Sequence, residues 1–358
     1  MAVHFHKITV REISNETPDC VSIVFAIPPE LREIFRYYAG QSLTIRTYQN
    51  NQELRRSYSL CSSPLEPEWR IAVKKVPGGL FSTYANETLS PGDTLEILPP
   101  VGNFYTQPNP ENKKNYVAFA AGSGITPILS MLKTILATEP RSSFTLIYGN
   151  RDSRSILFKE TLEALKNRYL QRLSLHYIFS REKTEAAINY GRIDEQKCNQ
   201  LFDRLISPDA DAFFICGPGD MIFRIRDFLL SKRIGEEKIH FELFTTSPRE
   251  PAVSHLAGES APSGVLSRIT IIHDGISSEF DLGFGDESIL DASIRQGIDL
   301  PYSCKGGVCC TCRARLKAGE VIMDANYALE SRELAAGFIL TCQSHPKTGR
   351  VIIDFDDR

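Results

Sequence analysis

Five of the nine cysteines fall within 39 residues near the C-terminus, and their spacing is typical of a metal site. Cys304, Cys309 and Cys312 form the pattern C-x4-C-x2-C, and Cys342 follows after 29 intervening residues. This is the spacing by which four thiolates hold a [2Fe-2S] cluster, three from one tight loop and the fourth from a distant segment. Cys310 is predicted not to be a ligand, because using it would change the spacing to x5 and x1.

A zinc site or a group of core thiols is the alternative interpretation of these cysteines. Zinc sites usually draw their ligands from two close pairs, and a single remote fourth cysteine fits that arrangement poorly. The C-terminal segment resembles the plant-type [2Fe-2S] ferredoxins over about 90 residues. The resemblance implies an α+β domain with the β-grasp fold.

A one-electron cluster cannot accept a hydride, so a chain that feeds it from a nicotinamide needs a flavin. Arg56, Tyr58 and Ser59 offer a guanidinium for a pyrophosphate, a phenol beside the isoalloxazine ring and a hydroxyl near its polar edge. A second stretch lies at the start of a predicted helix and contains Gly79, Leu80 and Ser82. The free backbone amides at a helix start are suited to bind a phosphate. Each stretch alone is also compatible with an ordinary strand or turn.

A nucleotide-binding motif is predicted further along the chain. Residues 121–127, with the sequence AGSGITP, follow a predicted strand and start a predicted helix. They depart from G-x-G-x-x-G, so the ordinary dinucleotide fingerprint is not matched. Cys216, Gly217 and Pro218 stand at the end of the fourth strand of the same segment. Taken alone, Cys216 would be interpreted as a buried structural thiol.

In this order the motifs resemble those of the ferredoxin-NADP reductase family, whose R-x-Y-S and G-x-x-S motifs bind FAD. The family's G-x-G-I-T-P and C-G-P motifs place the nicotinamide coenzyme against the flavin. The resemblance implies catalytic roles for Cys216, Glu242 and Tyr58, and an aromatic contact of Phe244 with the flavin. The implied cofactor-binding residues are Arg56, Tyr58, Ser59, Gly79, Leu80, Ser82, Gly122, Gly124, Thr126, Pro127, Cys216, Gly217, Pro218 and Phe244.

Two predicted strands of the nucleotide-binding segment end near an arginine. Arg151 follows the second strand, and Ser180 and Arg181 follow the third. A 2′-phosphate needs a cation and a hydroxyl, whereas no acidic residue ends the second strand to bind a ribose diol. NADPH is therefore the expected coenzyme. The alternative is that both arginines are solvated surface charges.

The elements that must position these groups predict a multidomain chain. Residues 1–108 contain many short β-type runs, which indicates an antiparallel β-barrel that binds FAD. Residues 113–245 alternate apolar strands with amphipathic helices, which indicates a parallel α/β domain that binds NAD(P). Residues 246–265 are predicted to be a flexible linker with a span of roughly 25 Å, so that the [2Fe-2S] ferredoxin-like domain of residues 266–358 can move.

Charge and hydropathy exclude several classes of partner. The net charge of −3 leaves no basic excess for phosphate backbones, so nucleic acid is not expected as a partner. No apolar stretch approaches about 18 residues and no signal-peptide pattern opens the chain, so we expect a cytoplasmic protein without a membrane segment. Residues 267–358 carry an acidic excess of four charges. This excess predicts a basic docking patch on the electron acceptor and a transfer rate that falls as salt rises.

The whole order of domains resembles the reductase components of multicomponent oxygenases, the phenylacetyl-CoA epoxidase group in particular. The resemblance implies an NAD(P)H-dependent oxidoreductase that passes electrons from NADPH to FAD, to the [2Fe-2S] cluster and to an oxygenase component. Two alternatives stay open. One is the reductase of another ring-hydroxylating or di-iron oxygenase, and the other is an electron-transfer subunit of a dehydrogenase complex.

Overall fold

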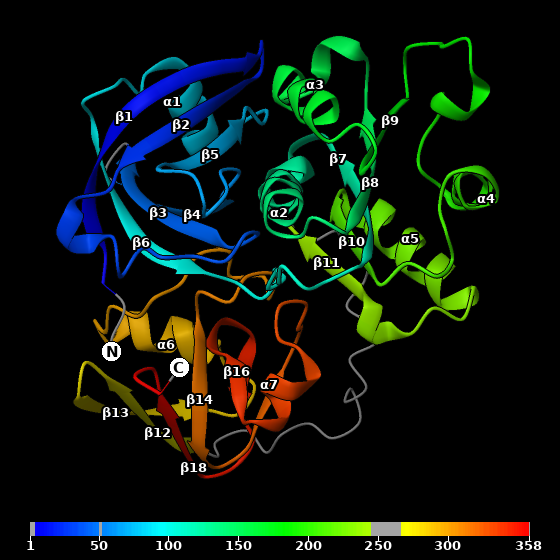
Figure 1. Cartoon of the computed structure of the whole chain (residues 1–358). Helices are drawn as coiled ribbons and strands as arrows, with labels where there is room; N and C mark the ends of the chain where they lie inside the picture. The colour runs from blue at the N-terminus through cyan, green and yellow to red at the C-terminus, as the bar shows by residue number, and fades with distance from the viewer. Residues whose placement is uncertain (1–3, 50–51, 245–265, 358) are drawn as a thin grey trace.

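The computed structural model describes residues 4–49, 52–244 and 266–357, which form three large sheets from successive parts of the chain (Figure 1). The linker predicted for residues 246–265 lies outside the described residues. Among the described helices, none combines the length and the apolar character needed to cross a bilayer.

The first sheet is antiparallel, with six strands in the order β4-β3-β6-β1-β2-β5. An antiparallel bridge between Leu60 and Ile71 connects the end of β4 to β5, so that the two edges of the sheet meet as in a barrel. Helix α1 packs Phe81 and Ala85 into the same core. The elements are β1 (His6–Thr17), β2 (Cys20–Ala26), β3 (Ser42–Gln49), β4 (Gln52–Ser59), β5 (Trp69–Lys74), α1 (Leu80–Glu87) and β6 (Thr94–Val101).

The second sheet is parallel, with the order β11-β10-β7-β8-β9 and helices on both faces. Chain order reverses between β7 and β10, and ligands bind at the carboxyl ends of strands beside such a reversal. The strands are β7 (Asn115–Ala121), β8 (Ser143–Asn150), β9 (Leu173–Phe179), β10 (Ala212–Gly217) and β11 (Ile239–Leu243). The helices are α2 (Ile125–Thr138), α3 (Lys159–Arg168), α4 (Glu195–Arg204) and α5 (Gly219–Ser231).

The third sheet has the order β13-β12-β18-β14-β16, with β12 and β18 parallel and the other pairs antiparallel. Asp274 and Gly275, which join β12 and β13, both have positive φ, at 57° and 70°, as a two-residue hairpin turn requires. The elements are β12 (Leu266–His273), β13 (Ile276–Gly283), α6 (Ile289–Arg295), β14 (Arg313–Ala318), β15 (Val321–Met323), α7 (Ser331–Ala335), β16 (Phe338–Leu340), β17 (Ser344–Pro346) and β18 (Arg350–Asp354). Strands β15 and β17 form a separate pair.

Short 3-10 helices connect several of these elements. They are η1 (Pro29–Leu31), η2 (Gly122–Gly124), η3 (Ser153–Ser155), η4 (Ala187–Asn189), η5 (Glu236–Lys238) and η6 (Thr341–Gln343). The antiparallel barrel, the parallel α/β sheet and the α+β unit confirm the predicted fold class. In Figure 1 the yellow-to-red C-terminal unit lies below the blue barrel and beside the green α/β unit, so all three meet at one junction.

Candidate functional site

Four of the five C-terminal cysteines converge on one loop and one 3-10 helix. The sulfur of Cys309 lies 3.2 Å from the sulfur of Cys304. Cys342, on η6, is within hydrogen-bonding reach of both Cys304 and Cys312. Cys310 points away from this group, and its thiol donates to the carbonyl of Ala328 at 3.3 Å. The structure therefore brings together the four predicted ligands and separates Cys310 from them.

The backbone of the cysteine loop is shaped to surround sulfur. The amide of Gly306 donates to the sulfur of Cys304 at 3.3 Å, and the side-chain amide of Gln343 approaches the sulfur of Cys342 at 3.6 Å. Gly307 has a φ of 73°, and a Cβ there would lie 2.9 Å from a backbone oxygen. Four sulfur donors surrounded by amide donors fit an iron-sulfur cluster, whose potential such hydrogen bonds tune.

Strand β4 and the start of α1 bring together the residues predicted to hold the flavin. Arg56 is exposed and forms no ion pair within the described part of the chain, and one of its nitrogens donates to the carbonyl of Arg55. The ring of Tyr58 lies 5.4 Å from that of Phe81 on α1. Burial raises the pKa of Tyr58 well above its usual range, so its phenol stays protonated. An exposed guanidinium beside a neutral phenol fits a flavin with its phosphates.

The turn before α1 is tight. Gly79 is the N-cap of the helix, and the hydroxyl of Ser82 accepts from the amide of Val76 and donates to the carbonyl of Gly79. A Cβ at Gly79 would lie 2.5 Å from the hydroxyl oxygen of Ser82. Leu80 is 44% exposed at the first turn. Ser82 therefore stabilises the turn by its own hydrogen bonds, and the remaining amides of the helix start are the groups suited to a phosphate.

The barrel and the parallel sheet meet at Ser59, Cys216 and Glu242. Cys216 and Glu242 are register neighbours on β10 and β11, and the hydroxyl of Ser59 donates to Oε2 of Glu242 at 3.0 Å. Cys216 is fully buried, and burial raises the pKa of its thiol. Burial also raises the pKa of Glu242 to about 8, so this carboxyl is neutral at pH 7. Phe244 lies just past the end of β11 and is 38% exposed.

Glu242→Gln should remove one source of pH-dependent stability. The folded chain holds the Glu242 proton more tightly than the unfolded chain between its ordinary pKa of 4.5 and its raised pKa of about 8. Its contribution is therefore complete below pH 4.5 and is lost as pH rises through about 8. We expect the thermal midpoint of the wild type to fall more steeply than that of the variant from about pH 5 to about pH 9. Parallel curves would contradict the raised pKa.

Glycines bring the start of α2 against the end of β10. Gly122 has a φ of 53°, and a Cβ at Gly124 would lie 2.2 Å from the carbonyl oxygen of Cys216. Thr126 and Pro127 are buried, and the hydroxyl of Thr126 donates to the carbonyl of Ser123 at 3.0 Å. These two side chains shape the turn from inside, while the backbone of the two glycines remains the part suited to a nucleotide.

A close approach of the same kind occurs at the neighbouring strand end. A Cβ at Gly217 would lie 2.7 Å from the side-chain end of Met221, and Pro218 is the N-cap of α5. The two turns that carry the predicted nucleotide motifs therefore lie side by side at the carboxyl ends of β7 and β10. This is the edge at which a parallel sheet of this order binds its ligand.

The arginines predicted to select the coenzyme have different surroundings. Arg151 is paired with Asp19 of the barrel at 2.9 Å. Arg181 is exposed and forms no ion pair within the described ranges. The hydroxyl of Ser180 makes a long hydrogen bond of 3.4 Å to the carbonyl of Asn150. Of the two cations, Arg181 is therefore the one available to a phosphate.

Family models match three successive parts of the chain. An oxidoreductase FAD-binding domain matches residues 7–105, an oxidoreductase NAD-binding domain residues 119–227, and a 2Fe-2S iron-sulfur cluster binding domain residues 271–347. The chain belongs to the ferredoxin-NADP reductase family, in the group with a C-terminal plant-type [2Fe-2S] ferredoxin domain. Its predicted class, a flavin- and iron-sulfur-dependent oxidoreductase, is thereby confirmed.

Two relatives are similar over nearly their whole length. The chain is 45% identical to a subunit of the 1,2-phenylacetyl-CoA epoxidase of Escherichia coli K12, over 98% of both chains. It is 32% identical to the ferredoxin reductase component of 3-ketosteroid-9-alpha-monooxygenase of Rhodococcus rhodochrous, over 97% of this chain and 96% of the relative. The solved structure of phthalate dioxygenase reductase matches its fold, with a TM-score of 0.58 and 24% identity over 98% of both chains.

No sequence motif assigns a role to the residues that join the ferredoxin domain to the barrel. Arg55 on β4 is only 5% exposed and contacts Asp299 and Leu300 of the ferredoxin domain. The one signal in the sequence is that Arg55 and Arg56 are consecutive on a strand, so they point to opposite faces. A strand segment with a charged side chain on each face cannot be covered by apolar core alone on either face.

Proposed function

We propose that this chain is the NADPH-dependent reductase component of a multicomponent oxygenase of the phenylacetyl-CoA epoxidase type. When bound, FAD would accept a hydride from NADPH, and the [2Fe-2S] cluster would pass electrons singly to the oxygenase component. The observation that carries the proposal is the meeting of three sites around β4. Ser59 reaches Glu242 of the nucleotide domain at 3.0 Å, and Ser57 reaches Ser303, next to Cys304, at 2.9 Å.

The residues at the junction would position the reacting rings. Oε2 of Glu242 accepts the hydrogen bond from Ser59, so the proton of the neutral carboxyl would lie on Oε1 and would be available to donate to a bound flavin. The thiol of Cys216 stays protonated because it is fully buried, so it acts as a wall for the nicotinamide and not as a nucleophile. Positioning of this kind supplies much of the rate in cofactor enzymes.

Binding of FAD would use the two groups on the barrel. The exposed guanidinium of Arg56 would contact the diphosphate, and the amides at the start of α1, beside Gly79, would complete the phosphate site. Tyr58 would lie against the isoalloxazine ring. Cys304, Cys309, Cys312 and Cys342 would hold the two irons.

The oxygenase partner is inferred from the relatives. The similar proteins are named as a subunit of an epoxidase and as a reductase component of a monooxygenase, and both cover nearly the full chain. The test is reconstitution of the holoenzyme with phenylacetyl-CoA epoxidase oxygenase subunits, followed by NADPH-dependent oxygen consumption with phenylacetyl-CoA. Iron and flavin analysis of the protein accompanies it. Oxygen consumption only with another class of oxygenase would contradict the assignment to the phenylacetyl-CoA epoxidase type.

Arg181→Ala should weaken NADPH binding and leave NADH binding nearly unchanged. A guanidinium hydrogen-bonded to a 2′-phosphate contributes about 1.5 kcal/mol, which corresponds to a rise in KM for NADPH of about tenfold. The measurement is anaerobic bleaching of the flavin against the concentration of each coenzyme. Lys183→Ala removes a nearby exposed cation and serves as the control. An equal change in KM for NADPH and NADH would contradict the assignment of Arg181.

A further inference from the structure

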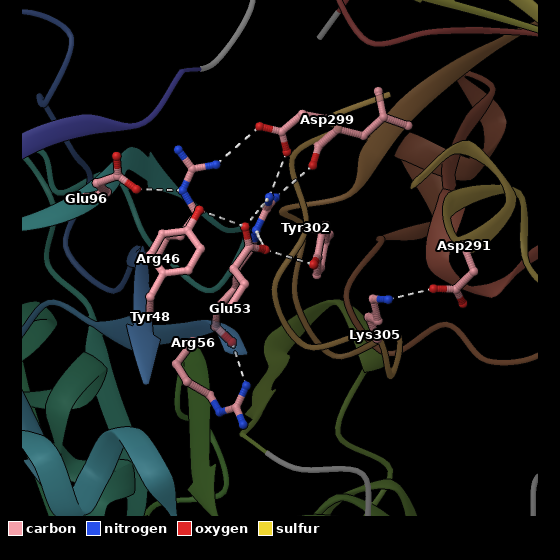
Figure 2. Close-up of polar contacts among 11 residues, drawn as sticks. Arg46, Tyr48, Glu53, Arg56, Glu96, Asp291, Asp299, Tyr302 and Lys305 are labelled. Atoms are coloured by element: carbon pink, nitrogen blue, oxygen red, sulfur yellow. Dashed lines mark hydrogen bonds and ion pairs between the residues drawn. The ribbon is translucent and has the colours of Figure 1, made fainter. Parts of the chain in front are cut away.

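A carboxylate of the ferredoxin domain lies between two arginines of the barrel (Figure 2). Oδ1 of Asp299 accepts from Arg55 at 2.7 Å, and Oδ2 accepts from Arg46 on β3 at 3.2 Å. Arg55 also donates to the carbonyl of Leu300 at 2.9 Å. The guanidinium of Arg55 is therefore fixed by two consecutive residues of the ferredoxin domain, which leaves its side chain only 4% exposed.

Glu53 and Tyr302 complete this cluster. Nε of Arg55 donates to Oε1 of Glu53 at 2.7 Å, and the hydroxyl of Tyr302 donates to the same oxygen at 3.1 Å. The guanidinium carbon of Arg55 lies 4.1 Å from the centre of the Tyr302 ring. Burial, the largest single effect, would raise the pKa of Asp299, but the hydrogen bonds and positive charges of Arg55 and Arg46 together outweigh it, so the pKa is lowered. Asp299 is thus ionised at neutral pH. The positive charge of the buried Arg55 is balanced by the carboxylates of Glu53 and Asp299.

The face of β4 that carries Arg55 contacts the ferredoxin domain at alternate residues. Glu53, Arg55 and Ser57 contact Tyr302, Asp299 and Ser303 respectively. Because side chains alternate across a strand, the intervening Arg56 points to the opposite face, toward the predicted flavin phosphate site. The strand therefore separates Arg56 and Tyr58, two of the residues predicted to bind the flavin, from the cysteine loop.

Two contacts between the barrel and the ferredoxin domain involve residues directly adjacent to predicted cluster ligands. Ser303, which pairs with Ser57, immediately precedes Cys304. Thr311, whose hydroxyl lies 3.1 Å from that of Thr44 on β3, immediately precedes Cys312. A movement of this interface would therefore move the cysteines themselves.

We propose that Arg55 and Asp299 are a positioning pair that holds the cysteine loop against β4 and thereby sets the separation of flavin and cluster. This inference rests on the proposed function for its role in electron transfer, while the docking itself can be tested without it. The pair is not catalytic, because neither residue belongs to the predicted cofactor contacts. A hydrogen-bonded ion pair suits this role because it fixes orientation as well as contact.

The decisive variant is Asp299→Asn, studied in the full-length holoenzyme. It removes one charge from a residue whose side chain is 64% exposed, so the barrel and the ferredoxin domain should each stay folded. Anaerobic stopped-flow with NADPH follows flavin bleaching and cluster reduction separately. We expect unchanged flavin bleaching and cluster reduction slowed about tenfold or more, since small misplacements cost large factors in rate. The matched control is Asp281→Asn, which breaks an exposed ion pair with Arg268 within the same domain.

A second variant and a second measurement separate positioning from loss of folding. Arg55→Lys keeps the charge but loses the fork that contacts Asp299 and Leu300 together, so it should restore only part of the rate lost in Arg55→Leu. Small-angle X-ray scattering should show a larger radius of gyration for Asp299→Asn than for the wild type or Asp281→Asn.

Each outcome bears on a different claim. Cluster reduction as fast in Asp299→Asn as in the wild type overturns the positioning pair, whatever the scattering shows. If NADPH does not bleach the wild-type flavin, the proposed function fails. In that case scattering still tests the docking of the ferredoxin domain on the barrel. An unchanged radius of gyration in Asp299→Asn overturns the docking role of the pair, and an increase supports it.

Discussion

Cys312→Ser should abolish cytochrome c reduction while NADPH still bleaches the flavin at the wild-type rate. Cys312 is 1% exposed and lies against Cys342. Water therefore cannot easily reach the position of its sulfur to replace it as an iron ligand. Its backbone carbonyl accepts from the hydroxyl of Thr341 at 3.0 Å, and this contact does not depend on the thiol. The loop should therefore keep its fold and lose only its ability to hold iron.

The matched control for this prediction is Cys310→Ser. Cys310 lies in the same loop, but its thiol donates to the carbonyl of Ala328, which a serine hydroxyl can also do. Iron content and cytochrome c reduction should stay close to those of the wild type. Equal loss of flavin bleaching and cytochrome c reduction in Cys312→Ser would contradict the order of electron transfer. Loss of iron in Cys310→Ser would contradict the ligand set.

Gly124→Ala should reduce the rate of flavin bleaching by NADPH about a hundredfold, because reacting groups tolerate little displacement. The new Cβ would lie 2.2 Å from the carbonyl oxygen of Cys216 and 2.7 Å from the amide nitrogen of Gly217. Both atoms belong to the backbone of β10, so the start of α2 must move away from the strand. The two turns predicted to bind the coenzyme would then separate. Anaerobic stopped-flow at the flavin absorbance measures the effect.

Gly349→Ala is the control for the added methyl group. A Cβ at Gly349 meets no atom within 4 Å, so the same substitution is made into open space. This variant should bleach its flavin at the wild-type rate. Iron content should be normal in both variants, because the added methyl group meets none of the four predicted cluster ligands in either case. A wild-type rate of flavin bleaching in Gly124→Ala would contradict this prediction. It would show that the close contact between Gly124 and β10 is not needed for reduction of the flavin by NADPH.

The three-part architecture could be predicted because it depends on local patterns. Alternating β-type runs, the change to apolar strands followed by amphipathic helices, and turns such as Asp274-Gly275 are all visible in neighbouring residues. The convergence of four cysteines could be predicted for a similar reason, since three of them occupy one loop. The backbone glycines Gly122 and Gly124 also carry their signal locally, as a turn between a strand and a helix.

Contacts between distant parts of the chain could not be predicted in this way. Arg55 and Asp299 are separated by 244 residues, and nothing near either one indicates the other. Arg151 is expected to face a coenzyme phosphate, yet Asp19, 132 residues earlier, is its ion-pair partner. Thr126 and Pro127 belong to a predicted binding motif, but their side chains are buried in the turn. Such outcomes depend on how separate sheets pack.

The two-sided use of β4 has a consequence for protein engineering. A foreign ferredoxin module grafted after residue 265 would meet a strand whose charges are arranged for an aspartate at position 299 and a tyrosine at position 302. A donor module without these groups would leave Arg55 with an unmatched positive charge in a buried setting. Chimeric reductases built on this scaffold should therefore exchange β3 and β4 together with the iron-sulfur module, as one transplantable unit.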